Sequence, residues 1–211
     1  MTTASTDIAG LILCGGRSSR MGGGDKSLLP LGSSTILARI ISRLGPIRPL
    51  AISANGDAAR FSAFALPVLA DTIPGYAGPL AGILAGMHWA AGQGREYLLT
   101  VAGDTPFFPT DLAGHLATAV AGLPGRIAVA SSNGRRHPVF ALWPTALRHD
   151  LGRFLVESGT GRVNTFIDLH DPVDVAFPLF EHDGQSIDPF FNINVPADLA
   201  EAERIAQMLD P

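Results

Sequence analysis

The sequence reads Leu13-Cys14-Gly15-Gly16-Arg17-Ser18-Ser19-Arg20-Met21-Gly22-Gly23-Gly24-Asp25-Lys26 directly after a short apolar run. That run, residues 8–13, predicts a buried strand. Five residues of the stretch are glycine, so the backbone can turn sharply and approach a ligand closely. Three basic side chains (Arg17, Arg20 and Lys26) accompany a single acid, Asp25. Because successive amide N–H groups and cations form a concavity suited to phosphate, the stretch predicts a nucleotide site.

Two better-known phosphate loops and a plain linker are the alternatives for this stretch. A Walker loop needs glycine directly before its lysine, and Asp25 stands there instead. A dinucleotide fingerprint needs G-x-G-x-x-G, which no register from Gly15 to Gly24 provides. A mobile glycine linker does not usually follow a buried strand so closely or concentrate arginine and lysine.

Bulk composition bounds the class of protein. With 211 residues, 46% hydrophobic and only 16% charged, the chain can bury a sizeable core and is not expected to be disordered. A net charge of -4 and a pI near 5.8 argue against an extended nucleic-acid surface. The single cysteine, Cys14, excludes an internal disulfide and fits a reducing compartment. No apolar run reaches the length of a membrane span and Met1 to Asp7 are too polar for a signal peptide, so we expect a cytoplasmic protein without membrane partners.

Strand-like and helix-like segments alternate along the chain. This alternation predicts an α/β fold with a mostly parallel sheet covered on both faces, in one domain over residues 1–211 that begins with a disordered tail, residues 1–7. The expected strands are residues 8–13, 50–53, 68–70 and 97–102, followed by a hairpin of residues 127–131 and 138–142 around Asn133-Gly134. The expected helices are one capped at Ser34 and stopped by Gly45-Pro46, one over residues 79–91, one capped at Thr110, and one over residues 196–208.

Polar residues follow several of these strands, at the edge where open parallel sheets bind their ligands. Asn55 follows the second strand, Asp71 the third and Asp104 the strand over residues 97–102. Asp104 is the best candidate for a metal ligand, because Mg²⁺ prefers hard oxygen and is often held by one or two carboxylates together with substrate phosphates. Taken alone, Asn55 would be a turn residue and Asp104 a helix cap or turn residue. Together with the glycine-rich stretch they favour a chemical role.

The glycine-rich stretch resembles the opening signature of the molybdenum cofactor guanylyltransferases, the MobA family, which reads approximately L-A-G-G-x-x-x-R-M-G-G-x-D-K. Every fixed position is met except the alanine, which Cys14 replaces. Later family motifs are also matched, as far as the last helix: Asp71, G-P-L-A-G at Gly78 to Gly82, D-T-P at Asp104 to Pro106, H-P at His137-Pro138, and Gly161-Arg162-Val163. The stretch from Phe191 to Leu199 resembles the family's F-x-N-x-N-T-P-x-D-L over its N-x-N-T-P-x-D-L part, with Val195 in place of threonine. The resemblance implies a nucleotidyltransferase of Rossmann-like, three-layer fold that binds GTP and Mg²⁺.

The resemblance and the chemistry of the side chains together assign roles in the donor half of the site. Arg20, Lys26 and Asp104 are the expected catalytic residues, and Asp104 is the expected Mg²⁺ ligand. The expected GTP-binding residues belong to the loop and the strand ends: Leu13, Cys14, Gly15, Gly16, Lys26, Asn55, Asp71 and Asp104. Some family members have asparagine where Ser53 stands, so the roles of Ser53 and Asn55 stay open. Cys14 is expected to pack as a small apolar residue, with a reactive thiol as the alternative.

The acceptor half is expected to use residues from the second half of the chain. The candidates are His137, Arg162, Asn192 and Asn194, with the hairpin arginines Arg135 and Arg136. For these two arginines a solvated flank beside the Asn133-Gly134 turn is an equally good interpretation. Asn192 and Asn194 alternate along an expected strand and would therefore share one face, where they contact the pterin or assist the metal.

The expected reaction joins a phosphate of molybdenum-molybdopterin to the α-phosphorus of GTP, forming a guanine dinucleotide cofactor and releasing pyrophosphate. Gly15 favours guanine, because the sister cytidylyltransferases read L-A-A-G and a glycine leaves room for the larger purine. A phosphate nucleophile has its second pKa at about 6, so the site must supply alignment and charge neutralisation and needs no strong general base. The rivals are a molybdopterin cytidylyltransferase, a sugar-phosphate nucleotidyltransferase of the same fold, and a non-catalytic GTP-binding adaptor. Molybdoenzyme chaperones and cofactor-insertion proteins are further candidate partners.

Overall fold

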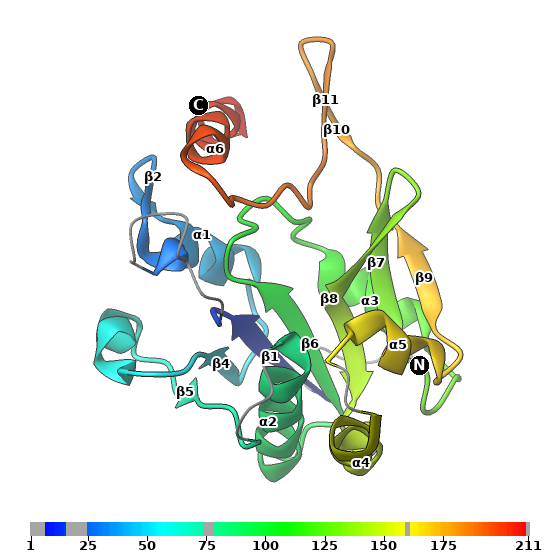
Figure 1. Cartoon of the computed structure of the whole chain (residues 1–211). Coiled ribbons are helices and arrows are strands. Elements are labelled where there is room, and N and C mark those ends of the chain that lie inside the picture. The colour runs from blue at the N-terminus through cyan, green and yellow to red at the C-terminus, as the bar shows by residue number, and fades with distance from the viewer. Residues whose placement is uncertain (1–6, 16–24, 74–77, 159–160, 210–211) are drawn as a thin grey trace.

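A seven-stranded sheet in the order β5-β4-β1-β6-β8-β7-β9 forms the centre of the molecule (Figure 1). The computed structural model describes residues 7–15, 25–73, 78–158 and 161–209. Of the expected tail, therefore, only Asp7 is described, and its carbonyl accepts a hydrogen bond from the backbone N–H of Glu96. The strands of the sheet are β1 (Ile8–Leu13), β4 (Leu50–Ser53), β5 (Val68–Leu69), β6 (Tyr97–Ala102), β7 (Ala128–Ser132), β8 (Arg135–Pro144) and β9 (Val173–Ala176). Two hairpins stand apart from it: β2 (Pro30–Leu31) with β3 (Ser34–Thr35), and β10 (Phe180–His182) with β11 (Gln185–Ile187).

The sheet is mostly parallel, as the alternation of elements predicts, and β8 is the strand that runs against its two neighbours. The tight turn from β7 into β8 causes this reversal. Asn133 and Gly134 both have positive φ, 45° and 72°, the conformation that a two-residue hairpin turn requires. Because β8 is reversed, its first residues lie at the same edge of the sheet as the carboxyl ends of β1, β4 and β6.

Helices cover both faces of the sheet in a three-layer arrangement (Figure 1). Each face of the sheet carries its own hydrophobic core, and successive residues of β1 point to opposite faces. Ile8 and Ile12 pack on one face, and Ala9 and Leu11 pack on the other. The first face is covered by α1 (Ile36–Arg43), α3 (Leu112–Ala119) and α6 (Pro196–Leu209), and the second by α2 (Pro79–Gly92), α4 (Arg148–Ser158) and α5 (Val163–Asp168). Within the described ranges, no helix reaches the length and apolarity that a bilayer crossing requires.

Two of the expected helix caps are wrong by one residue. Thr35, not Ser34, caps α1, because the Thr35 hydroxyl accepts from the N–H of Ala38. Asp111, not Thr110, precedes α3. The chain also contains α4, α5, β9 and the β10–β11 hairpin, which the sequence patterns had not indicated.

The start of α6 lacks half of a capping box, which leads to a prediction about stability. The Asp198 carboxylate accepts from the backbone N–H groups of Asn194 (2.7 Å) and Val195 (2.9 Å). The Asp198 N–H donates to the Val195 carbonyl at 2.9 Å, but the Val195 side chain has no oxygen that could also accept from it, as a capping threonine would. We expect Val195→Thr to add that bond and stabilise the fold by roughly 0.5–1 kcal/mol, raising the thermal midpoint by about 1–4 °C. Scanning calorimetry measures the shift.

A matched control is Val156→Thr, which makes the same change within α4, where the side chain is also exposed (68%) and no cap can form. Its midpoint should stay within error of the wild type or fall slightly. A Val195→Thr variant that is no more stable than Val156→Thr would contradict the capping argument.

Candidate active site

The carboxyl ends of the parallel strands bring the expected donor residues to one edge of the sheet. Leu13 ends β1, where its carbonyl accepts from the N–H of Gly103, just past β6, and the Cys14 N–H donates to the carbonyl of Ser53, at the end of β4. These close backbone contacts leave little room. A Cβ on Gly103 would lie 2.8 Å from the Cys14 sulfur, so glycine is required there. Two expected loop residues, Gly16 and Arg20, lie outside the described residues.

Lys26 meets the asparagines of the segment before α6. Lys26 is the first residue of the 3₁₀ helix η2 (Lys26–Leu28), and its ammonium donates to Asn194 Oδ1 at 3.1 Å. The Asn194 amide in turn donates to Asn192 Oδ1 at 2.7 Å. The two asparagines therefore do lie together, but the expected strand is wrong: residues 188–195 form no strand. The same segment reaches the Asp104 loop, because the N–H of Ile193 donates to the Asp104 carbonyl at 2.9 Å.

Asp104 is a largely buried carboxylate beside Lys26. Burial raises the pKa of Asp104, while a hydrogen bond from Thr105 Oγ1 (3.2 Å) and the charge of Lys26 act in the opposite direction. A carboxylate held in such surroundings is stabilised by a cation, and hard oxygen is what Mg²⁺ selects. Among the described residues no group of three or more His, Cys, Asp or Glu side chains could hold a metal. A Mg²⁺ ion held by one carboxylate and by nucleotide phosphates needs no such group, so Asp104 fits this ion.

Asn55 and Asp71 form a reciprocal pair beyond β4 and β5. The Asn55 amide donates to Asp71 Oδ2 at 2.7 Å, and the Asp71 backbone N–H donates to Asn55 Oδ1 at 3.0 Å. Ser53, by contrast, is buried against α2: its hydroxyl would lie 2.4 Å from a Cβ on Gly82. Asn55 is therefore the exposed one of the two at this strand end, where a ligand can reach it, while Ser53 is buried.

His137 ties the segment before α6 to the start of β8. Its Nε2 lies 2.7 Å from the hydroxyl of Ser132, which donates its proton to Asp188 at 2.8 Å, so Nε2 is the donor to the hydroxyl. The imidazole also stacks on Phe190 with centroids 4.4 Å apart. Burial lowers the pKa of His137, and the charge of Asp188 opposes that shift. His137 is thus a neutral donor at the edge of the sheet.

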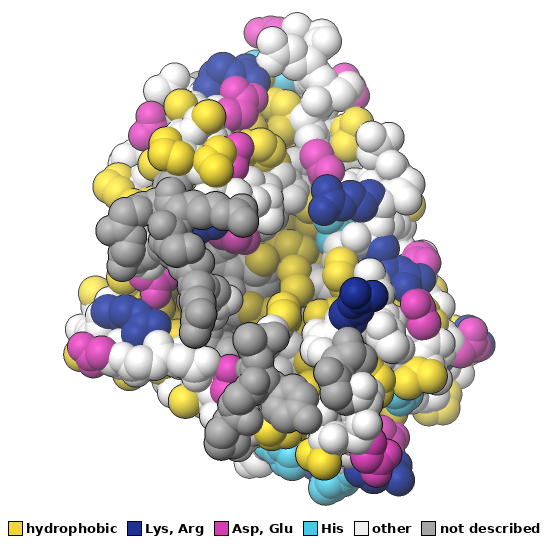
Figure 2. Space-filling model, in the orientation of Figure 1, with side chains coloured by type: hydrophobic (Ala, Val, Ile, Leu, Met, Phe, Trp, Pro, Cys, Tyr) yellow, Lys and Arg dark blue, Asp and Glu magenta, His cyan; other side chains and the backbone are white. Residues whose placement is uncertain are grey.

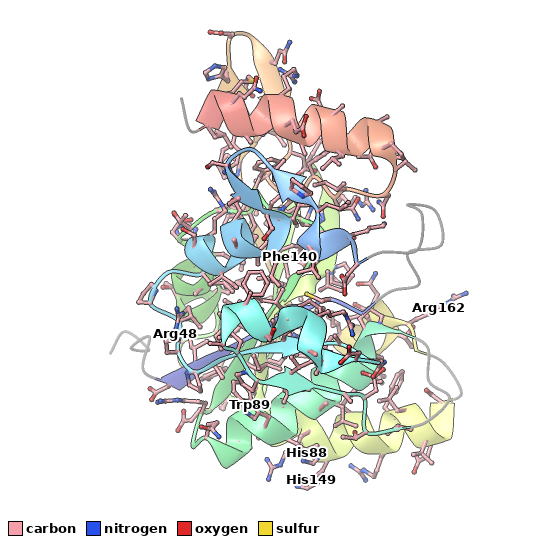
Figure 3. All side chains as sticks on the ribbon, turned by 90° about the vertical axis from the view of Figure 1, so that its left-hand side faces the viewer. Arg48, His88, Trp89, Phe140, His149 and Arg162 are labelled. Carbon is pink, nitrogen blue, oxygen red and sulfur yellow. The ribbon has the colours of Figure 1, made fainter. Side chains whose placement is uncertain are left out.

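The three arginines expected near the acceptor differ in their surroundings. Arg136 forms ion pairs with two carboxylates, Asp168 at 2.6 Å and Asp174 at 2.7 Å, which raise its pKa and hold its guanidinium at the surface. Arg135 is exposed at the turn. Arg162 stands before α5 and extends outward from the body of the molecule (Figure 3). Figure 2 shows Lys and Arg side chains along one side of a central hollow in this face, with apolar side chains inside the hollow.

Comparison with known proteins identifies the family of this site. Residues 10–173 match the family model of the MobA-like NTP transferase domain. The chain belongs to this family. A molybdenum cofactor guanylyltransferase of Mesorhizobium japonicum is 60% identical over 205 residues, which are 96% of this chain and 98% of that one. A guanylyltransferase of the same name from a Bradyrhizobium species is 44% identical over 99% of this chain and 98% of its own length.

Solved structures agree with this MobA-like fold. The molybdopterin-guanine dinucleotide biosynthesis protein A of Archaeoglobus fulgidus superposes with a TM-score of 0.72 at 19% identity, covering 94% of this chain and 98% of that one. A nucleotidyl transferase of Methanothermobacter gives a TM-score of 0.69 at 17% identity, covering 96% and 99%. At such low identities the likeness extends to the fold alone, and it confirms the expected three-layer nucleotidyltransferase architecture.

Cys14 is the position at which this MobA-like chain departs from the opening signature. Burial raises the pKa of its thiol to about 12, and the charges of Asp25 and Asp104 add to the shift. The thiol is therefore protonated at neutral pH and packs against the core, as expected of a small apolar substitute. The neighbouring Gly15 is different, because a Cβ there would meet nothing within 4 Å. No described protein atom therefore forbids a side chain at Gly15.

One participant in the site was missed by the sequence analysis. Arg60, in the 3₁₀ helix η3 (Ala58–Phe64), forms an ion pair with Asp25 at 2.9 Å. Asp25 also accepts from the Ser27 hydroxyl at 2.9 Å. No local signal singles out Arg60, because its partner lies 35 positions earlier in the chain.

Proposed function

We propose that this chain transfers GMP from GTP to molybdenum-molybdopterin, forming the molybdopterin guanine dinucleotide cofactor and releasing pyrophosphate. The observation that carries the proposal is the meeting of Lys26, Asn194 and Asp104 at the carboxyl edge of a nucleotidyltransferase sheet. Near full-length relatives with the guanylyltransferase name support the same reaction.

The residues of the edge would act by alignment and charge neutralisation. Lys26, with Arg20 of the loop, would bind the phosphates of GTP, and Asp104 would hold Mg²⁺. When bound, Mg²⁺ offsets the negative charge that builds up on the phosphates. Asn194 already orients the Lys26 ammonium through the 3.1 Å hydrogen bond and so holds it ready for the triphosphate. Since the attacking phosphate is largely ionised, no side chain has to remove a proton.

The Asn55–Asp71 pair would select the base. Asn55 occupies one carboxylate oxygen of Asp71, which leaves the other to accept from the N1–H and the 2-amino group of guanine. Cytosine offers no donor at the ring nitrogen that faces such an acceptor. The open space at Gly15 suits the larger purine. Leu13 and Cys14 would supply backbone groups beside it.

Replacing Asp71 tests this selection. We expect Asp71→Asn to lower kcat/KM for GTP by about a hundredfold, because an asparagine offers a competing donor to the guanine edge. The loss with inosine triphosphate, which lacks the 2-amino group, should be smaller, so the preference for GTP over inosine triphosphate should shrink. Asp57→Asn is the matched control, because the described contact of the Asp57 side chain is its cap on η3, and asparagine caps equally well. An unchanged preference in Asp71→Asn would exclude this carboxylate from base recognition.

The acceptor would bind on the β8 side of the edge. His137 presents a neutral ring there, and Arg162 and Asn192 provide a cation and an amide for the anionic pterin phosphate. Delivery of the product to molybdoenzyme chaperones and cofactor-insertion proteins belongs to the same proposal. So does a cytoplasmic location, which the single, protonated cysteine fits.

Product analysis tests the reaction as a whole. The chain is incubated with Mg-GTP and molybdenum-loaded molybdopterin, and the products are identified by mass. A guanine dinucleotide and one pyrophosphate per turnover are expected. Parallel thermal-shift measurements with GTP, CTP and UTP separate the rivals, since selective stabilisation by CTP or UTP would contradict the guanine assignment.

A further inference from the structure

Asp25 is held in place by described neighbours that bind both of its carboxylate oxygens. Its Oδ2 accepts from Arg60 Nε and its Oδ1 from the Ser27 hydroxyl, both at 2.9 Å, and only 15% of the side chain is exposed. The Asp25 carbonyl also accepts from the N–H of Leu28, which closes the single turn of η2. The orientation of Asp25 therefore determines where η2 begins and where Lys26, its first residue, points.

The Arg60 guanidinium joins Asp25 to the loop that follows β4. Its Nη2 donates to the backbone carbonyl of Asn55 at 2.8 Å and its Nη1 to the carbonyl of Asp57. The guanidinium lies 4.6 Å from the centre of the Phe61 ring, and Phe61 is fully buried. A planar group with five fixed donors can serve three acceptors in different directions while it stacks on a ring. A lysine ammonium could serve one of these acceptors and could not stack in the same way.

These contacts form one continuous path across the donor site. Asn55 is also the partner of Asp71, through hydrogen bonds of 2.7 and 3.0 Å. Arg60 thus lies between the pair assigned to the base and the lysine assigned to the phosphates. From this geometry we infer that Arg60 is a positioning residue, which fixes Asp25 so that Lys26 meets the triphosphate of a nucleotide whose base lies at Asn55 and Asp71. The inference rests on the proposed guanylyl transfer.

The dissociation constants of guanosine and of Mg-GTP, measured by calorimetry, test the role. The dissociation constant of guanosine divided by that of Mg-GTP reports how much the triphosphate adds to binding. We expect Arg60→Ala to lower this ratio by about tenfold, because Lys26 loses its orientation. The dissociation constant of guanosine alone should change by less than about threefold, because the Asn55–Asp71 pair remains. Arg60→Lys should fold as the wild type does and still show most of the loss. Millimolar methylguanidinium should restore the ratio in Arg60→Ala.

Arg48→Ala is the matched control. Arg48 also donates to two backbone carbonyls, those of Gly45 and Ile47, but it precedes β4 at the opposite edge of the sheet (Figure 3). Its ratio should equal that of the wild type. Equal losses for guanosine and GTP in both Arg60 variants, or a lower thermal midpoint with an unchanged ratio, would overturn the inference. A wild-type chain that binds neither guanosine nor GTP would instead overturn the guanylyl proposal, and the inference with it.

Discussion

Replacing Asp104 with asparagine is expected to lower the rate of guanylyl transfer by about a thousandfold or more, as the loss of a group that stabilises charge in the transition state typically does. The same change is expected to raise the thermal midpoint of the nucleotide-free chain near pH 7. The two effects have one cause. Burial raises the pKa of Asp104 above its ordinary value of 3.8, so keeping the carboxylate charged in the native state costs stability. In the proposed reaction that charge would hold Mg²⁺, and asparagine removes both the charge and its cost.

The sign of this effect sets its pH dependence. A group whose native pKa is raised destabilises the fold once the pH exceeds the unfolded pKa, and the full cost is present above the native pKa. The stability gain of Asp104→Asn should therefore be largest near pH 7 and shrink as the pH falls through the raised pKa, because the wild-type carboxyl then takes up its proton. Calorimetry across this range measures it, and mass analysis measures transfer. Asp111→Asn, at an exposed carboxylate before α3, is the control. Near-normal transfer by Asp104→Asn would remove this residue from the mechanism.

The edge of the sheet that carries the site could be predicted because it depends on local patterns. Apolar runs of four to six residues predict β1, β4 and β6. The rule that ligands bind at the carboxyl ends then places the polar residues that follow them. The Asn133-Gly134 turn is equally local, and its two positive φ angles follow from the residue types. Short, half-exposed strands such as β9–β11 lack these signals, because packing and not pattern decides whether they form.

The parts of the site that could not be predicted depend on contacts distant in sequence. Lys26 and Asn194 are 168 positions apart, and nothing in either neighbourhood announces the other. The regular spacing of Asn192 and Asn194 suggests a strand. The backbone takes another path there because Asp198 binds the N–H of Asn194 and the Ile193 N–H is bonded to the Asp104 loop. The sequence pattern therefore predicts correctly that the two asparagines lie together, but wrongly that they lie on a strand. Their position beside Lys26 is visible only in the structure.

Lys26→Met is expected to lower kcat/KM for GTP by roughly a hundred- to a thousandfold. Methionine is of similar length to lysine, but it removes the charged donor from a partly buried site. Removing the ammonium also frees Asn194 Oδ1, which then has no cation to orient. The fall should appear in kcat more than in KM, since negative charge on the departing pyrophosphate increases toward the transition state. Lys26→Arg keeps the charge and should retain part of the rate. Steady-state transfer, followed by the mass of the dinucleotide, gives both constants.

A double variant distinguishes a shared site from two separate ones. If Lys26 and Asp104 act on one triphosphate, Lys26→Met combined with Asp104→Asn should be little slower than the slower single variant, because either loss already disables the aligned complex. Independent roles would instead multiply the two losses. The arrangement favours the shared site, since Ile193 bonds to the Asp104 loop and the next residue, Asn194, bonds to Lys26. Fully multiplicative losses, or a Lys26→Met variant within about threefold of the wild type, would separate this lysine from the chemistry at Asp104.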